Sequence, residues 1–143
     1  MTANMDMLNH AISRWNAGDL DGYLGLYDDG IRLHGYTPQP MNKAEVAGFY
    51  RQIWDSLAER GKPNPRLEVL DVFETGDKVT CRFVMSGTHS GEFMGVPKSG
   101  SDYALPGITI LQFANGRVAE RWSSADMLGL MMQIGAIPMP HAA

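Results

Sequence analysis

The second half of the chain carries three segments of strand-like sequence, and these constrain the fold more than any other feature. Every second residue from Val79 to Met85 is apolar, within a segment that runs from residue 78 to 88. Segments 103–113 and 118–123 are of the same kind, and Asn115-Gly116 between them is typical of a two-residue hairpin turn. A repeat of two residues is the period of a strand with one buried face. We therefore predict a run of antiparallel strands here.

The first half is predicted to be mainly helical. Apolar residues recur at steps of three and four between residues 5 and 15, which is the spacing of one helix face. Asn42 with Glu45 forms a capping box that opens a long helix ending near Gly61, and a short strand at 31–36 precedes it. Helices followed by antiparallel strands indicate an α+β fold. A curved sheet around such helices would leave a cavity between the two layers.

Composition limits the possible partners and the location. The 143 residues predict one domain covering 1–143. The net charge is −4 and Lys and Arg do not cluster, which argues against a nucleic-acid partner, and no apolar run approaches the ~20 residues of a membrane span. The single cysteine, Cys81, suits a reducing cytoplasm, and we expect no signal peptide. Neither a metal-binding His or Cys spacing nor a phosphate-binding glycine loop occurs.

The stretch from Glu120 to Gly135 begins with strand-like alternation and ends with helical spacing, and Asp126 lies at the junction. Two roles are open for this carboxylate. Aspartate is a favoured N-cap, so Asp126 could simply open the final helix. Burial beside Trp122 and the leucines and methionines of that helix would instead suit Asp126 as a general acid/base, because burial favours the protonated form of a carboxyl group.

Two histidines are candidates for a site. His34 shares a strand face with Arg32, opposite the apolar Ile31 and Leu33, and could shuttle protons or hold a carbonyl oxygen near neutral pH. His89 lies in a glycine-rich segment that we expect to be a loop or a bulged hairpin. For each histidine a hydrogen-bonded structural role is the alternative.

Further side chains could bind a substrate. Gln112 shares a strand face with two isoleucines, so it either lines a pocket that needs one hydrogen bond or lies exposed at an edge. Arg82 could fix an anionic or carbonyl group, although we favour a cross-strand ion pair. Tyr50, Trp54 and Phe93 are expected to line the site or to belong to the core, and Trp122 is expected to bind the substrate.

Two motifs carry a resemblance to a known family. Residues 87–97 read Gly-Thr-His-Ser-Gly-Glu-Phe-Met-Gly-Val-Pro, and residues 113–122 read Phe-Ala-Asn-Gly-Arg-Val-Ala-Glu-Arg-Trp. Asp126 and the run Gln133-Ile134-Gly135 follow at the spacing of the family. In these features, and over nearly its whole length, the chain resembles the SnoaL-like polyketide cyclases of the NTF2-like superfamily.

The resemblance implies a cone-shaped fold, in which a curved antiparallel sheet packs around N-terminal helices and leaves a deep apolar pocket. It also implies homodimers or higher homo-oligomers formed through sheet faces, and an intramolecular aldol cyclisation without metal or organic cofactor, with Asp126 as general acid/base. The chain departs from the family at Lys98-Ser99, where Pro-Thr is common, and at Gln112, where the cyclases place a histidine.

We therefore expect a cytoplasmic enzyme that acts on a small apolar or aromatic carbonyl compound through an enolate. Asp126 and His34 are the expected catalytic residues, and polar groups such as His34 and Gln112 are expected to stabilise the oxyanion. Cyclisation, isomerisation and dehydration all share the enolate step. A non-catalytic protein that binds small molecules is the alternative.

Overall fold

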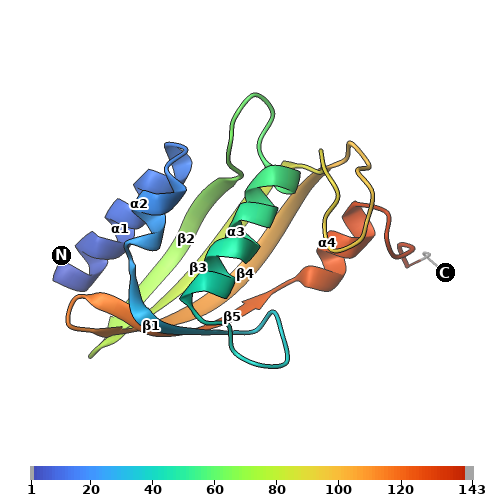
Figure 1. Cartoon of the computed structure of the whole chain (residues 1–143). Coiled ribbons are helices and arrows are strands. Elements are labelled where there is room, and N and C mark those ends of the chain that lie inside the picture. Colours follow the sequence, from blue (N-terminus) through green and yellow to red (C-terminus); the bar gives the residue numbers. More distant parts are fainter. Residues whose placement is uncertain (1, 141–143) are drawn as a thin grey trace.

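The computed structural model describes residues 2–140, and Figure 1 shows its helices and strands along this part of the chain. In chain order they are α1 (Ala3–Asn16), α2 (Leu20–Leu24), β1 (Tyr27–His34), α3 (Lys43–Leu57), β2 (Arg66–Thr75), β3 (Lys78–Thr88), β4 (Asp102–Ala114), β5 (Arg117–Ala125) and α4 (Met127–Gln133). The predicted α+β order, with helices before the main run of strands, is confirmed.

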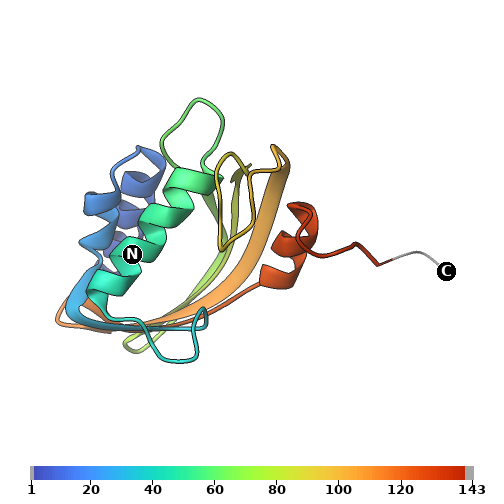
Figure 2. The same ribbon diagram turned by 45° about the vertical axis from the view of Figure 1, so that its right-hand side comes forward.

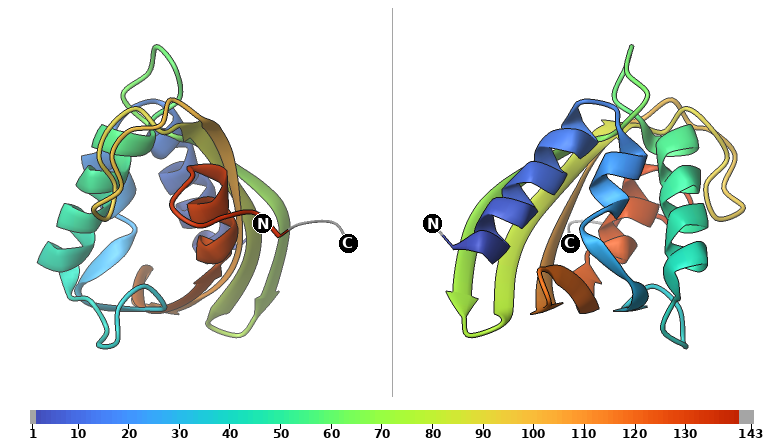
Figure 3. Two further views of the ribbon diagram at one scale, coloured as in Figure 1. Left: turned by 90° about the vertical axis from the view of Figure 1, so that its right-hand side faces the viewer. Right: turned by 60° about the vertical axis from the view of Figure 1, so that its left-hand side comes forward.

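The strands form one curved, open sheet in the order β1-β5-β4-β3-β2. β1 runs parallel to β5, and the other neighbouring pairs are antiparallel. Helices α1, α2 and α3 lie on the concave side of the sheet, and α4 packs against β4 near one end (Figure 3). The predicted curved sheet around N-terminal helices is confirmed.

Local sequence explains where α3 begins and ends. The Asn42 side chain accepts a hydrogen bond from the Glu45 N–H at 3.0 Å, and the Glu45 carboxylate accepts one from the Asn42 N–H at 3.1 Å, so the predicted capping box is confirmed. The helix ends at Leu57 and not near Gly61, because Ala58 has an extended backbone and its carbonyl accepts from the Thr88 N–H of β3.

A glycine allows α3 to approach β3 at this end. A Cβ atom on Gly87 would lie 2.4 Å from the carbonyl oxygen of Leu57, which no residue with a side chain could tolerate without movement. The chain then leaves β3 and forms the loop 89–101, which lies beside the C-terminal part of α3 (Figure 2). Of the two forms predicted for the glycine-rich segment 87–100, a loop or a bulged hairpin, the structure shows a loop from residue 89 onward, while Gly87 and Thr88 still belong to β3.

The alternation predicted for β3 and β4 places one face of each strand in the core. The buried inner-face residues are Val79, Cys81, Phe83, Met85, Tyr103, Leu105, Leu111 and Phe113. The helices contribute the facing layer, with Leu8, Trp15, Tyr23, Val46, Tyr50, Ile53 and Leu57. Among residues 2–140, no helix has the length and apolar character needed to cross a membrane.

Candidate active site

An apolar pocket lies between the helices and the inner face of the sheet. Its walls come from all four helices, from strands β2 to β5, from the segment after β1 and from loop 89–101, and its aromatic members are Trp15, Tyr23, Tyr36, Phe49, Tyr50, Phe83 and Phe93. The free volume is about 40 Å³, which is room for a few water molecules at most. A ring-sized ligand therefore requires side chains of the rim to move.

Arg121 is the charged residue that lines this pocket. It projects inward from β5, and only 8% of its surface is exposed. Its Nε donates to Thr109 Oγ1 at 2.8 Å, and its Nη1 donates to the hydroxyls of Tyr23 and Tyr50 at 3.0 and 3.1 Å. Nη1 also donates to the hydroxyl of Tyr27. Buried arginines normally have an acidic partner, yet the ion pairs found among residues 2–140 do not include Arg121.

The tyrosines around Arg121 do not neutralise its charge. Burial raises the pKa of Tyr23, Tyr27 and Tyr50 far above the usual value of about 10. Burial alone would lower the pKa of Arg121, but the surrounding tyrosine oxygens act in the other direction, and the pKa lies above its ordinary value. The inner end of the pocket therefore carries one positive charge among neutral hydroxyls at neutral pH.

Asp126 lies outside the pocket. Its Oδ1 accepts from the Gly129 N–H at 2.8 Å and caps α4, so the helix-cap role is confirmed. The expected burial is wrong, because Asp126 is exposed and its neighbours Trp122 and Leu128 are 36% and 57% exposed. The next residue, Met127, lines the pocket, which places the carboxylate at the pocket wall but facing outward. The catalytic role of Asp126 stays a prediction.

His34 and Trp122 lie together on the outer face of the sheet. The parallel pairing of β1 with β5 sets them side by side, and their rings stack with centroids 5.7 Å apart. The Nε2 of His34 is 2.6 Å from the carboxylate of Glu120. Since neither ring lines the pocket, the hydrogen-bonded structural role fits His34, and the expectation that Trp122 lines the site is wrong.

Gln112 and Arg82 also lie on the outer face. Gln112 lies on the same strand face as the exposed isoleucines of β4, and its amide donates to Asp77 at 3.2 Å, so the expected pocket wall is wrong. The alternative of exposure at an edge does not describe it either, because Gln112 is half-buried and β4 is the central strand of the sheet. Arg82 donates to the carboxylate of its cross-strand neighbour Asp71 at 2.7 Å, which confirms the ion pair that we favoured.

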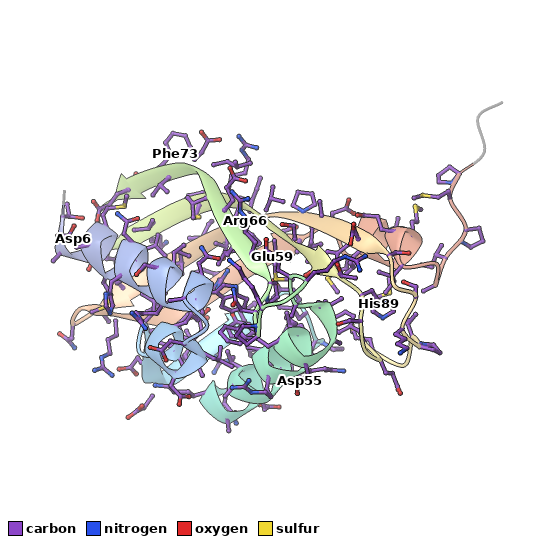
Figure 4. All side chains as sticks on the ribbon, turned by 90° about the horizontal axis from the view of Figure 1, so that it is seen from above. Asp6, Asp55, Glu59, Arg66, Phe73 and His89 are labelled. Atoms are coloured by element: carbon purple, nitrogen blue, oxygen red, sulfur yellow. The ribbon has the colours of Figure 1, made fainter. Side chains whose placement is uncertain are left out.

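His89 and Trp54 are buried away from the pocket, whereas Tyr50 and Phe93 line it. The His89 Nδ1 accepts from the Ser99 N–H at 3.1 Å, which fixes loop 89–101, and Figure 4 shows His89 on this loop. Trp54 packs against Trp15 in the core, with ring centroids 5.2 Å apart. Among residues 2–140, the His89 Nε2 and the Trp54 indole nitrogen are the buried side-chain atoms without a hydrogen-bond partner.

Sequence reasoning missed Arg121 and its tyrosine partners, because it placed the wrong face of β5 inside. Phe113 pairs with Val118 as a two-residue hairpin requires, but Gln112 pairs with Glu120, so Ala119 is an extra residue. A one-residue bulge moves the following side chains to the opposite faces of the sheet. Arg121 consequently points inward, and nothing in the local sequence indicates the bulge.

No metal-binding cluster accompanies the pocket. Within the described residues 2–140, no group of three or more His, Cys, Asp or Glu side chains is arranged to hold a metal ion. The polar groups that line the pocket are the guanidinium of Arg121 and tyrosine hydroxyls, and the rest of the wall is apolar.

Comparison with known proteins identifies the family. The family model described as SnoaL-like polyketide cyclase matches residues 6–134, and the chain therefore belongs to this family. The nogalonic acid methyl ester cyclase of Streptomyces nogalater is 23% identical over 129 residues, which cover 87% of this chain and 91% of that protein. The aklanonic acid methyl ester cyclase DnrD of Streptomyces peucetius is 21% identical over 140 residues, which cover 94% and 92%.

Solved structures share the fold. The crystal structure of AclR from Streptomyces galilaeus superposes with a TM-score of 0.83 and 24% identity, covering 94% of this chain and 97% of that chain. The structure of TsrD from Streptomyces laurentii gives a TM-score of 0.80 with 24% identity, covering 94% and 96%. The α+β fold expected from the sequence, with a curved sheet around helices, is thus shared with both solved structures.

Proposed function

We propose that this chain is a cofactor-independent enzyme of the cyclase type, which acts on a small apolar or aromatic carbonyl compound through an enolate. The observation that carries the proposal is the interior pocket, whose walls are apolar and whose hydrogen-bond donors gather at Arg121 and the tyrosines. Apolar walls suit the carbon skeleton, and the donors suit a carbonyl oxygen on which negative charge develops. The names of the two related methyl ester cyclases support cyclisation as the reaction.

The proposed step is balanced without an oxidant or a reductant. A base removes a proton from the carbon next to a carbonyl group, and the electron pair of the broken C–H bond moves onto the carbonyl oxygen. In a cyclisation the enolate carbon then attacks a second carbonyl of the same molecule, whose oxygen takes up the proton. Isomerisation and dehydration begin with the same proton removal, so they belong to the same proposal.

Asp126 is the proposed base, on the strength of its family spacing. Its carboxylate caps α4 next to the pocket-lining Met127 and faces outward. The role therefore requires the first turn of α4 to shift, so that the carboxylate enters the pocket when a ligand is bound. The same movement would widen a pocket whose free volume is only about 40 Å³.

Exchange of a ligand's α-protons for deuterium tests the proposal directly, with acetophenone as the probe. Asp126→Asn keeps the helix cap, since asparagine caps helices as well as aspartate does, but it cannot accept the proton. We expect wild-type protein to catalyse the exchange, and we expect the exchange rate to be at least about 100-fold lower in Asp126→Asn. Unchanged exchange in Asp126→Asn would remove Asp126 from the mechanism. His34→Asn in the same assay tests the catalytic role expected for His34.

The second candidate function is that of a non-catalytic protein that binds small molecules. It is favoured by one observation, namely that the carboxylate of Asp126 and the ring of His34 both face away from the pocket. Such a protein would gain thermal stability with acetophenone but would not exchange its α-protons. An enzyme would show both effects, so the two measurements separate the candidates.

We also propose that the outer face of the sheet binds a second copy of the chain. A row of neighbouring residues crosses the five strands on this face, formed by Phe73, Thr80, Ile110, Trp122 and His34. Phe73 is 66% exposed and projects away from the helices (Figure 4), and Ile108 beside the row is 51% exposed. Apolar patches of this kind on a protein surface are typical of protein–protein interfaces.

A further inference from the structure

The hydrogen-bonding groups around Arg121 include a donor that the protein does not use. The Nε and Nη1 atoms of Arg121 are bonded to Thr109 and to three tyrosines, but Nη2 has no hydrogen bond to any of residues 2–140. Nη2 is not among the fully buried side-chain atoms that lack a partner, so part of it is accessible, and Arg121 lines both this pocket and an adjoining smaller hollow that includes Cys81 and Thr109. A guanidinium nitrogen with unused N–H bonds therefore lies in the region shared by the pocket and the smaller hollow beside it.

The tyrosines supply a second unused donor. Tyr27 is hydrogen-bonded to Tyr23 at 3.3 Å and to Tyr50 at 2.7 Å, and each of the three oxygens accepts from Arg121. Three hydroxyls have three protons, but the two bonds between tyrosines use only two of them. Whichever way the hydroxyls rotate, one O–H is left without an acceptor, and both Tyr23 and Tyr50 line the pocket.

The charge of the pocket also favours an anionic ligand. The residues that line the pocket include Arg121 but neither aspartate nor glutamate, and the tyrosines remain protonated because burial raises the pKa of each. A buried cation without a counter-ion is costly. An anionic oxygen in the pocket would supply the missing charge and accept both unused donors.

We infer that the ligand of this pocket binds through an anionic oxygen, held by the Nη2 of Arg121 and by the free hydroxyl of the Tyr23–Tyr27–Tyr50 network. The ligand class is an apolar or aromatic compound with a carboxylate, or with the readily ionised enol of a 1,3-dicarbonyl. The inference rests on the proposed function and deepens it, because an enolate formed during the reaction would bind in the same way. The position also explains why the inner end of an otherwise apolar pocket is polar.

Calorimetric titration with matched small probes tests the inference on the protein as it is. Benzoate and benzamide have the same size but differ in charge, and 1,3-cyclohexanedione supplies an ionisable enol. We expect wild type to bind benzoate on the order of tenfold or more tightly than benzamide, as charge-assisted hydrogen bonds require. Binding of benzoate alone would assign a carboxylate ligand, and binding of the dione as well would assign the enolate.

Variants place the effect at Arg121. Arg121→Gln should lose the preference for benzoate, Arg121→Lys should keep part of it, and Arg82→Gln on the outer face serves as the matched control with the preference intact. If Arg121→Gln does not fold, the test rests on wild type and Arg121→Lys. The ratio of the benzoate and benzamide affinities should then be smaller in Arg121→Lys than in wild type. Equal binding of the two probes, no binding of any probe, or an unchanged preference in Arg121→Gln would overturn the inference.

The binding test of the anion site and the exchange test of the proposed enzyme can give different answers. A charge preference that depends on Arg121 without any α-proton exchange of acetophenone would support the anion site and refute the enzyme. Exchange without a charge preference would support the enzyme and refute the anion site.

Discussion

Arg121 of β5 and Tyr50 of α3 are joined by a 3.1 Å hydrogen bond across the interior, between residues 71 positions apart in the chain. The contact connects the sheet to the helix that forms the opposite wall of the pocket. One partner is a cation and the other is a neutral hydroxyl, so the bond is charge-assisted but leaves the positive charge in place. The same group of side chains therefore holds the two layers together and gives the pocket its charge.

The hydroxyl of Tyr27 should contribute more to stability than an ordinary buried tyrosine hydroxyl. Tyr27→Phe removes an acceptor from the buried Arg121, and we expect the free energy of unfolding to fall by about 1.5–3 kcal/mol. Tyr103→Phe is the matched control, because that hydroxyl is also buried but donates to the uncharged carbonyl of Leu57, and we expect a loss of about 0.5–1.5 kcal/mol. Urea denaturation at neutral pH measures both losses, and equal losses would contradict the special role of Arg121.

Stability should decrease steeply in alkaline solution. Burial raises the pKa of Tyr23, Tyr27, Tyr50 and Tyr103 in the folded protein, whereas in the unfolded chain they titrate near about 10. Above that pH the unfolded state releases protons that the folded state retains, so the free energy of unfolding is fully present below pH ~10 and falls as the pH rises. Burial also raises the pKa of the Cys81 thiol. Because a thiol in the unfolded chain loses its proton at a lower pH than a tyrosine, the loss of stability should begin somewhat below pH ~10.

Urea denaturation at a series of pH values, combined with tyrosinate absorbance, measures this effect. The absorbance of these four tyrosines should appear together with unfolding and not before it. Ionisation of all tyrosines in a protein that is still folded would show that the cluster around Arg121 is open to solvent.

Much of this architecture could be predicted from the sequence, because it depends on local patterns. The capping box of Asn42 and Glu45, the alternation of β3 and the Asn115-Gly116 turn each specify their element without help from the rest of the chain. The family resemblance to the cyclases was likewise carried by short motifs, and the family match over residues 6–134 confirms it.

The site was predicted less well, because it depends on the register between strands. The extra residue Ala119 reverses the faces of β5, which moves Trp122 outward and Arg121 inward. A prediction from sequence pattern also places arginine on the exposed face of a strand, because arginine is rarely buried without partners. Here the partners are tyrosines from α2, β1 and α3, which hydrogen-bond to the guanidinium. Those tyrosines come together only in the folded chain.

Two glycines should respond to alanine in opposite directions. Gly48 is exposed in the middle of α3 and a Cβ there meets nothing within 4 Å, so Gly48→Ala should stabilise the protein by about 0.5–1 kcal/mol. At Gly87 a Cβ would lie 2.4 Å from the Leu57 carbonyl oxygen, so Gly87→Ala must push α3 away from β3 and should cost about 1–3 kcal/mol. Thermal unfolding of both variants checks the pair, and a neutral Gly87→Ala would mean that this end of α3 is free to move.

A charge on the outer face of the sheet should separate the proposed pair of chains. Ile110 lies in the middle of the row that crosses the strands, between Thr80 and Trp122, so Ile110→Glu would place a carboxylate at the centre of an apolar contact. We expect light scattering to give a multiple of the chain mass for wild type and the single-chain mass for Ile110→Glu. Met94→Glu is the control, because Met94 is 51% exposed but lies on loop 89–101 beside α3, away from that face. A single-chain mass for wild type, or loss of the oligomer in Met94→Glu as well, would show that the outer face is not the interface.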